Sequence, residues 1–254
     1  MCVTVYPISM PNSHAGVSHD WTHRRGAVPG TFSIAAYEPE TGKTGVAVST
    51  ALVGVGALCP FVSENAAVAT QSFVKVSHGR NAVDFADRGV SVPTACDALL
   101  SDDENASYRQ LHGIDTENQK FTFSGDDCVE WYGETTGEHH TAAGNMLAGP
   151  DVIEAVSETF EEHDGLLSER LMSALEAGQA AGGDKRGKIS AALLVYAPEP
   201  KLYHNLRIDN SDDPVADLRD AYELGRQTEE QLPEQAEDML GDYPEEILDF
   251  GIKY

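Results

Sequence analysis

The sequence predicts an α+β protein built as a four-layer αββα sandwich, in which helices flank two packed antiparallel sheets. The chain has 254 residues, which is enough for one large domain with a substantial core. Its predicted strands come in groups that are separated by pairs of amphipathic helices, whereas parallel α/β proteins alternate the two kinds of element. Each predicted helix carries one apolar stripe, and two packed sheets with helices on both outer faces bury all of these stripes.

The first strand is expected at residues 30–37, where aromatic and β-branched side chains follow a glycine. Pro39 and Gly42 mark the turn after it. A second strand at 45–51 is expected to return alongside the first.

The remaining elements follow from the same two patterns. Strands are expected where apolar and β-branched residues gather between turn residues, at 66–73, 108–114, 119–124, 128–132, 140–146, 189–197 and 201–208. A tight turn at 198–200 joins the last two. Helices are expected where apolar residues recur every three or four positions, at 81–88, after the capping residue Ser91, at 151–160, at 166–180 and from 213 onward.

The two ends of the chain differ from its middle. Residues 1–30 contain scattered Pro, Gly and Asn without periodicity, so we expect a disordered or removable extension. Residues 31–225 carry the predicted elements and form the domain. Residues 226–254 are rich in carboxylates and are expected to form an acidic tail.

The net charge of −25 comes from 42 acidic and 17 basic residues. Such a charge repels nucleic acid and anionic membranes, so neither is an expected partner. It is typical of a protein that stays hydrated in concentrated salt; a halophilic source is the preferred explanation, and an acidic interaction tail is the alternative.

No apolar run reaches membrane-spanning length and residues 1–30 lack the apolar stretch of a secretory signal, so we expect a cytoplasmic protein.

Neither the cysteines nor the histidines follow a metal-binding pattern. Cys2, Cys59, Cys96 and Cys128 lie far apart and are expected to be unpaired, buried thiols. The nine histidines include one adjacent pair, and no spacing typical of a zinc site occurs. We therefore expect no metal and no cofactor, because phosphate-loop and dinucleotide motifs are missing as well.

One loop concentrates positive charge. Residues 182–188 place Lys185, Arg186 and Lys188 beside Asp184 and between glycines. In so acidic a chain this indicates an anion site, or a network that orients a carbonyl or carboxylate group. It is equally typical of cations that follow a helix and complement its dipole.

Other polar residues are candidates for a pocket. Asn145 lies among small residues and is suited to donate to a developing oxyanion, although a turn residue between a strand and a helix is the simpler interpretation. Gln71 ends an apolar strand and is either a pocket residue or an ordinary polar strand end. Thr31 either begins its strand or, if the bond before it is cut, carries a hydroxyl and a free amine, which are a nucleophile and its base.

Several segments together resemble the domain-of-unknown-function family 1028. They are 31–34 (TFSI), 68–72 (VATQS), 144–147 (GNML), 177–187 (AGQAAGGDKRG) and 213–215 (DPV), and the resemblance covers roughly residues 31–225. That family is classed with the N-terminal nucleophile hydrolases. The resemblance therefore implies the αββα sandwich of that class and a nucleophile at the start of the first strand, which is Thr31.

Chains of this family often begin with Met directly before that threonine, whereas here residues 1–30 precede it. Either the start is wrongly placed, or the bond between Gly30 and Thr31 is cleaved autocatalytically as in the active subunits of the proteasome, or Thr31 is never exposed and the fold is inert. Cys2 is a rival terminal nucleophile, because removal of Met1 would expose it, but no strand follows it.

The expected function is hydrolysis of an amide bond in a small molecule or a short peptide. Thr31 is the expected nucleophile and Asn145 the oxyanion donor. Asp184 and Arg186 are expected to orient the amino terminus or to bind a substrate carboxylate. Substrate contacts are expected from Ser49, Gln71, Lys185 and Lys188. The alternatives are a non-catalytic protein that binds a small anion through the 182–188 cations, and an assembly module that uses the acidic tail; a homodimer is the commonest assembly.

Overall fold

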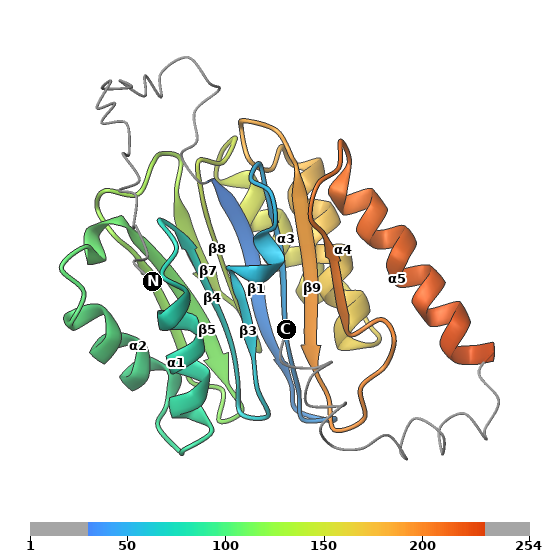
Figure 1. Cartoon of the computed structure of the whole chain (residues 1–254), viewed down its shortest axis with the longest axis horizontal. Helices are drawn as coiled ribbons and strands as arrows, with labels where there is room; N and C mark the ends of the chain where they lie inside the picture. The colour runs from blue at the N-terminus through green and yellow to red at the C-terminus, as the bar shows by residue number, and fades with distance from the viewer. Residues whose placement is uncertain (1–29, 232–254) are drawn as a thin grey trace, which may run out of the picture.

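Two antiparallel sheets lie face to face between two layers of helices in the computed structural model, which describes residues 30–231 (Figure 1). Helices α1 (Val76–Ala86) and α2 (Val92–Ser101) cover one outer face. Helices α3 (Asp151–Glu162) and α4 (Leu167–Ala180) cover the other, and α5 (Pro214–Gln231) lies beside them at the edge. The predicted α+β sandwich is confirmed.

The larger sheet has six strands in the order β10-β9-β2-β1-β8-β7. Their bounds are β1 Thr31–Glu38, β2 Lys43–Thr50, β7 Gly133–Thr136, β8 His140–Asn145, β9 Ser190–Tyr196 and β10 Asn205–Ile208. Strand β1 pairs with β2 on one side and with β8 on the other. The first residue of β1 is therefore held from both sides.

The smaller sheet has four strands in the order β3-β4-β5-β6. Their bounds are β3 Pro60–Val62, β4 Ala66–Ser72, β5 Arg109–Asp115 and β6 Lys120–Ser124. Two short 3-10 helices, η1 Val55–Ala57 and η2 Ala106–Tyr108, precede β3 and β5. Every strand pairing in both sheets is antiparallel among the described residues.

Alternation along β1 divides its side chains between two environments. Phe32 and Ile34 pack against α3 and α4 in a large buried cluster. Ala35 packs instead with small residues between the two sheets. Thr31 and Ser33 share the side of Ala35, so the polar side chains at the start of β1 point toward the second sheet.

The strand expected at 128–132 is not formed; the strand in this region, β7, begins at Gly133. The backbone N–H groups of Met146 and Leu147 donate to Val129 O at 2.9 Å and to Trp131 O at 3.0 Å. This apolar segment therefore covers the chain just after β8 and does not extend the sheet.

The strand expected at 201–208 is shorter than predicted, since β10 contains only its second half. His204 N donates to Lys201 O at 3.0 Å, and Lys201 N donates to His204 Nδ1 at 3.1 Å. These bonds close a turn, so the tight turn expected at 198–200 is part of a longer loop. Strand β3 was not predicted, because it is very short and begins with Pro60, which is unfavourable in strands.

Cys59, Cys96 and Cys128 are free and buried, as the sequence predicts. Cys2 and the extension up to residue 29 lie outside the described residues, as does the acidic tail from residue 232 onward. Helix α5 continues past the expected domain boundary at 225 to Gln231. Within residues 30–231 no helix has both the length and the apolar character that crossing a bilayer requires.

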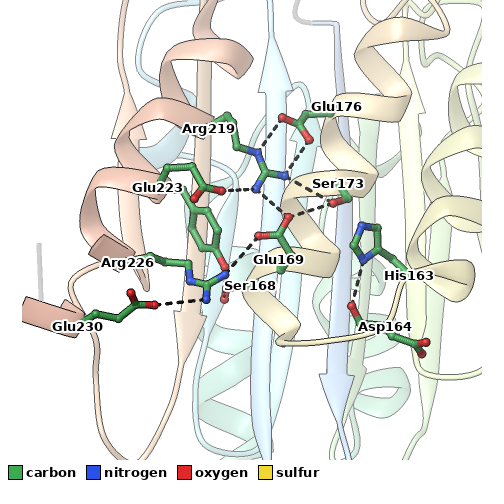
Figure 2. Close-up of polar contacts among 11 residues, drawn as sticks. His163, Asp164, Ser168, Glu169, Ser173, Glu176, Arg219, Glu223, Arg226 and Glu230 are labelled. Carbon is green, nitrogen blue, oxygen red and sulfur yellow. Dashed lines mark hydrogen bonds and ion pairs between the residues drawn. The ribbon is translucent and has the colours of Figure 1, made fainter. Parts of the chain in front are cut away.

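Arg219 joins α5 to α4 through two carboxylates (Figure 2). Its Nε and Nη2 donate to the two oxygens of Glu176, each at 2.8 Å, and its Nη1 donates to Glu169 at 2.8 Å. The guanidinium also lies over the ring of Tyr222, 5.3 Å from the centroid. Only 18% of the Arg219 side chain is exposed, so solvent screens these contacts less than those of a surface pair.

Replacing Arg219 by Ala is expected to lower the free energy of unfolding by about 2 kcal/mol, because charge-assisted hydrogen bonds are lost and Glu169 and Glu176 lose their cation. The control is Arg226→Ala: that side chain is 36% exposed, and its ion pairs with Glu169 and Glu230 span 4.0 and 3.9 Å. A loss of about 0.5 kcal/mol or less is expected there. Urea unfolding measures both values, and equal losses would contradict the role of Arg219 in docking α5.

Candidate active site

Three polar residues meet across the larger sheet where β1 begins. The register places Thr31 opposite Thr50 of β2 and opposite Asn145 of β8. Directly opposed side chains lie on the same face of a sheet, so all three point toward the second sheet. Their exposed fractions are 3%, 1% and 0%. Thr31 Oγ1 donates to Thr50 Oγ1 at 3.2 Å.

The loop between α4 and β9 lies against the end of β8. Ala148 N donates to Gly183 O and Lys185 N donates to Met146 O, both at 3.0 Å. Gly183 has a φ of 54°, in the left-handed region that favours glycine, so the glycine allows the loop to turn here. The backbone bonds hold the following residues, 184–186, beside the end of β8.

Asp184 and Arg186 form an ion pair that is directed at the carbonyl of Gly30. Asp184 Oδ1 accepts from the backbone N and the Nε of Arg186, each at 2.9 Å. Asp184 Oδ2 accepts from Ala51 N at 3.1 Å and from Arg186 Nη2. Arg186 Nη2 also donates to Gly30 O at 3.0 Å, and Thr50 Oγ1 donates to the same oxygen. The Gly30 carbonyl thus receives one cationic donor and one hydroxyl donor.

Residue 30 has no space for a side chain. A Cβ added to Gly30 would lie 2.6 Å from Met146 Cβ, 2.8 Å from Asp184 Oδ2 and 3.0 Å from Arg186 Nη2. These distances are shorter than van der Waals contact. The ion pair of Asp184 and Arg186 can therefore approach the backbone this closely only because residue 30 is glycine.

A chain of buried amides connects Asn145 to the second sheet. Asn145 Nδ2 donates to Gln110 Oε1 at 2.9 Å, and Gln71 Nε2 donates to the same oxygen at 2.8 Å. Ser33 Oγ donates to Gln71 Oε1 at 2.6 Å. All four side chains are completely buried. Because these buried groups are paired with one another, the chain links the two sheets in one relative position.

His112 is the last member of this hydrogen-bond network, and its imidazole is neutral. Ser33 gives its single hydroxyl proton to Gln71, so His112 Nε2 is the donor in its 2.8 Å bond to Ser33 Oγ. His112 Nδ1 then accepts from Thr141 Oγ1 at 2.8 Å. Complete burial, assisted by the neighbouring His140, lowers the pKa of His112 to about 3. The imidazole is therefore uncharged at neutral pH.

The structure brings together the four residues that the sequence proposes for catalysis. Thr31 and Asn145 are register partners, and Asp184 and Arg186 reach the residue before Thr31. Gln71, proposed as a substrate contact, belongs to the network that holds Asn145.

The other proposed substrate contacts point elsewhere. Ser49 lies on the face of β2 that the helices cover, opposite to the face of Thr31. Lys185 Nζ donates to Glu130 O at 2.5 Å, and Lys188 Nζ pairs with Asp213 Oδ1 at 2.5 Å. The cations of the 182–188 loop therefore have separate partners and do not converge on one point.

Sequence reasoning missed Thr50, Gln110 and His112. Thr50 could have been found, because a hairpin with its turn at 39–42 places residue 50 opposite residue 31. Gln110 and His112 are two positions apart, so their side chains lie on the same face of β5. This local pattern does not indicate which strand of the other sheet they contact.

Two residues next to the network have a left-handed backbone without being glycine. Ser72, with φ of 63°, follows Gln71, and Met146, with φ of 53°, follows Asn145. Such conformations cost about 1–3 kcal/mol each and often occur at functional sites. They turn the chain at the ends of β4 and β8, directly after the amides of Gln71 and Asn145.

Comparisons with known proteins agree with this fold. Residues 31–218 match the model of a family described as Family of unknown function (DUF1028). Among solved structures, the crystal structure of protein SPO2555 from Silicibacter pomeroyi, assigned to DUF1028, is similar with a TM-score of 0.73. The two sequences are 30% identical, and the match covers 80% of this chain and 92% of that one. The search of curated proteins gave no match.

The buried histidines are expected to make the stability of the fold depend on pH. Besides His112, burial is the main cause that lowers the pKa of His140 and of His204, each to about 4. In an unfolded chain a histidine takes up its proton near pH 6.5. Below that pH the unfolded chain therefore holds more protons than the folded one, so stability falls as the pH falls from 6.5 toward 4.

Each of these histidines is expected to contribute a loss of about 1.4 kcal/mol per pH unit below 6.5. Urea unfolding at about pH 7.5 and about pH 5 covers a window in which most carboxylates stay ionised. The variant His112→Gln is expected to reduce the loss by about 2 kcal/mol, because one titrating group is removed. A wild-type free energy of unfolding that is equal at both pH values would show that these imidazoles are not held neutral.

Proposed function

We propose that this chain, which belongs to the Family of unknown function (DUF1028), is an N-terminal nucleophile hydrolase whose nucleophile is Thr31. Thr31 becomes the first residue when the bond after Gly30 is cut, and the enzyme then hydrolyses an amide bond of a small molecule or a short peptide. The hydrogen bonds around that bond carry the proposal. Arg186 and Thr50 both donate to the Gly30 oxygen, and the Thr31 hydroxyl donates to Thr50.

Cleavage of the Gly30–Thr31 bond needs no outside reactant except water. Thr31 Oγ attacks the carbonyl carbon of Gly30, and its proton passes through the Thr50 hydroxyl to the Gly30 oxygen. The C–N bond breaks as this proton moves on to the nitrogen, which leaves Gly30 as an ester on Thr31 Oγ. Water hydrolyses the ester, so Gly30 becomes a carboxylate and Thr31 regains its hydroxyl beside a free α-amine.

Arg186 is suited to stabilise the negative charge that develops on the Gly30 oxygen during the attack. Donors that are already in place for an oxyanion contribute about 3–4 kcal/mol where they have been measured. Asp184 keeps the guanidinium aimed, since it accepts from both the Nε and the Nη2 of Arg186. These contacts favour Arg186 and Thr50 for the oxyanion role that the sequence suggested for Asn145, whose amide nitrogen donates to the second sheet.

After cleavage, the α-amine of Thr31 is the base for turnover. An α-amine has a pKa of roughly 7.7–8.0, so a useful fraction is neutral near neutral pH. The amine takes the proton of Thr31 Oγ as this oxygen attacks the substrate carbonyl, and it gives the proton to the leaving nitrogen. Water then attacks the resulting ester, loses a proton to the same amine and releases the acid.

Binding of a small anion without catalysis is the alternative function, and the contacts of the 182–188 cations do not favour it. Lys185 is bonded to a backbone carbonyl and Lys188 to Asp213. Arg186 is bonded to Asp184 and to the Gly30 carbonyl. An anion would have to displace these partners, and it would meet the carboxylate of Asp184 next to Arg186.

The variant Thr31→Ala is expected to keep residues 1–30, because it lacks the attacking oxygen, whereas the wild-type protein is expected to begin at Thr31. Intact mass and amino-terminal sequencing measure both. Amide hydrolysis is expected to fall about a thousandfold or more, with a stability cost of about 1 kcal/mol for the lost hydrogen bond. Thr136→Ala on β7, an exposed threonine, is the control that should behave as wild type. A wild-type chain that retains residues 1–30 would remove Thr31 from the mechanism.

The variant Thr50→Val keeps the shape of the side chain and removes the hydroxyl between Thr31 and Gly30. Cleavage is expected to slow by about a hundredfold to a thousandfold, because one oxyanion donor and the path for the proton are lost. The matched control is Thr70→Val, since Thr70 is also buried and its hydroxyl has no hydrogen-bond partner among the described residues. A time course of intact mass measures both rates; a similar slowing in the two variants would count against the role of Thr50.

A further inference from the structure

The orientation of the Gln110 amide is fixed by a backbone carbonyl. Gln110 Nε2 donates to Gly144 O at 2.8 Å and to Ser124 Oγ at 2.8 Å, with a longer contact to Gly133 O at 3.4 Å. A backbone carbonyl accepts hydrogen bonds and never donates them. The nitrogen of Gln110 must therefore face β8, and its oxygen must face the other side chains of the network.

This orientation determines the orientation of the neighbouring amides. Gln110 Oε1 has no proton, so Gln71 and Asn145 must each give it an N–H group, which agrees with their distances of 2.8 and 2.9 Å. The nitrogen edge of the Asn145 amide is thus directed at Gln110. Its carbonyl oxygen is on the opposite edge of the same planar group.

We propose that Asn145 presents this carbonyl oxygen to the α-amine of the freed Thr31 and holds that amine as a hydrogen-bond acceptor, with Gln110 setting the polarity. The proposal rests on the proposed function. Asn145 is the register partner of Thr31, so the two residues are direct neighbours on adjacent strands. A freed amine has lost its peptide plane and turns about a single bond, so an acceptor is needed to aim its lone pair at Thr31 Oγ. Asn145 is thereby a positioning residue and not an oxyanion donor.

The described residues that surround the start of β1 come from one loop and from both sheets. The loop before β9 contributes Asp184 and Arg186, which contact the residue before Thr31. Strand β2 contributes Thr50, β8 contributes Asn145 and the second sheet contributes Gln110, all of them uncharged. Substitutions at 145 or 110 leave both charged residues in place, so a change in the pKa of the amine reports on the amide network.

The test measures the pKa of the Thr31 α-amine in the cleaved protein. Trace acetic anhydride labels the amine at a rate that follows its neutral fraction, and mass spectrometry of the amino-terminal peptide reads the labelling between about pH 5 and pH 10. Removal of an acceptor destabilises the protonated amine, so Asn145→Leu is expected to lower its pKa by about one unit. Asn145→Asp keeps an acceptor and adds a charge, so the pKa is expected to rise.

Two further variants separate positioning from general damage. Gln110→Leu leaves Asn145 in place but removes the group that orients it, so a smaller decrease of the amine pKa is expected. Ser124→Ala removes the partner of Gln110 on the side away from Asn145 and keeps the bond to Gly144 O. It is expected to leave the amine pKa unchanged.

The outcomes are distinct. An amine pKa that is the same in wild type and in Asn145→Leu overturns the acceptor role and leaves the hydrolase proposal standing. Cleavage of wild type together with complete loss of cleavage in both Asn145→Leu and Gln110→Leu also overturns it, because Asn145 would then act in the cleavage step as a donor. A wild-type chain that never exposes Thr31 overturns the proposed function and this proposal with it.

Discussion

The carbonyl oxygen of Gly30 is the point on which the geometry of the site depends. It receives Arg186 from the loop before β9 and Thr50 from the end of β2, so it joins segments that are far apart in the sequence. Both donors reach it because β1 lies in the centre of its sheet and because residue 30 has no side chain. A chain with 42 acidic and 17 basic residues thus places one of its few cations on a neutral carbonyl, and Asp184 keeps it there.

The space between the sheets combines two kinds of packing that are usually separate. Small apolar residues such as Ala35, Ala67 and Ala69 fill one part of it. The part next to Thr31 holds amides, hydroxyls and a neutral imidazole that bond to one another. Charged groups there would cost far more to bury than neutral ones. The network between the sheets therefore obtains a defined orientation at each of its polar groups while using only neutral side chains. The bond from Gln110 to Gly144 O fixes the direction of the hydrogen bonds in this network.

Most of the helices and strands could be predicted from the sequence because strand and helix periods are local properties. Two segments were predicted wrongly as strand. Residues 128–132 accept hydrogen bonds from the segment that follows β8, and residues 201–204 close a turn through bonds to one another. For the site, motifs were enough to indicate Thr31, Asn145, Asp184 and Arg186, which the structure places together. They were not enough for Ser49, because its side chain lies on the face of the strand opposite to Thr31. The contacts of Gln110 and His112 depend on how two sheets pack, which no local pattern encodes.

The hydrolase function and the anion-binding function both depend on whether the bond between Gly30 and Thr31 is intact. While Gly30 is joined to Thr31, the guanidinium of Arg186 is bonded to a carbonyl of its own chain, and an incoming ligand has to compete with a group that is held in place covalently. A covalently tethered partner has a very high effective concentration, so a free anion is a poor competitor for it. In the proposed cleavage this tether is lost, and a substrate carbonyl can then accept hydrogen bonds from Arg186 and Thr50. An uncut chain is therefore poorly suited to either role, and release of Gly30 is the step from which both catalysis and ligand binding at Arg186 would follow.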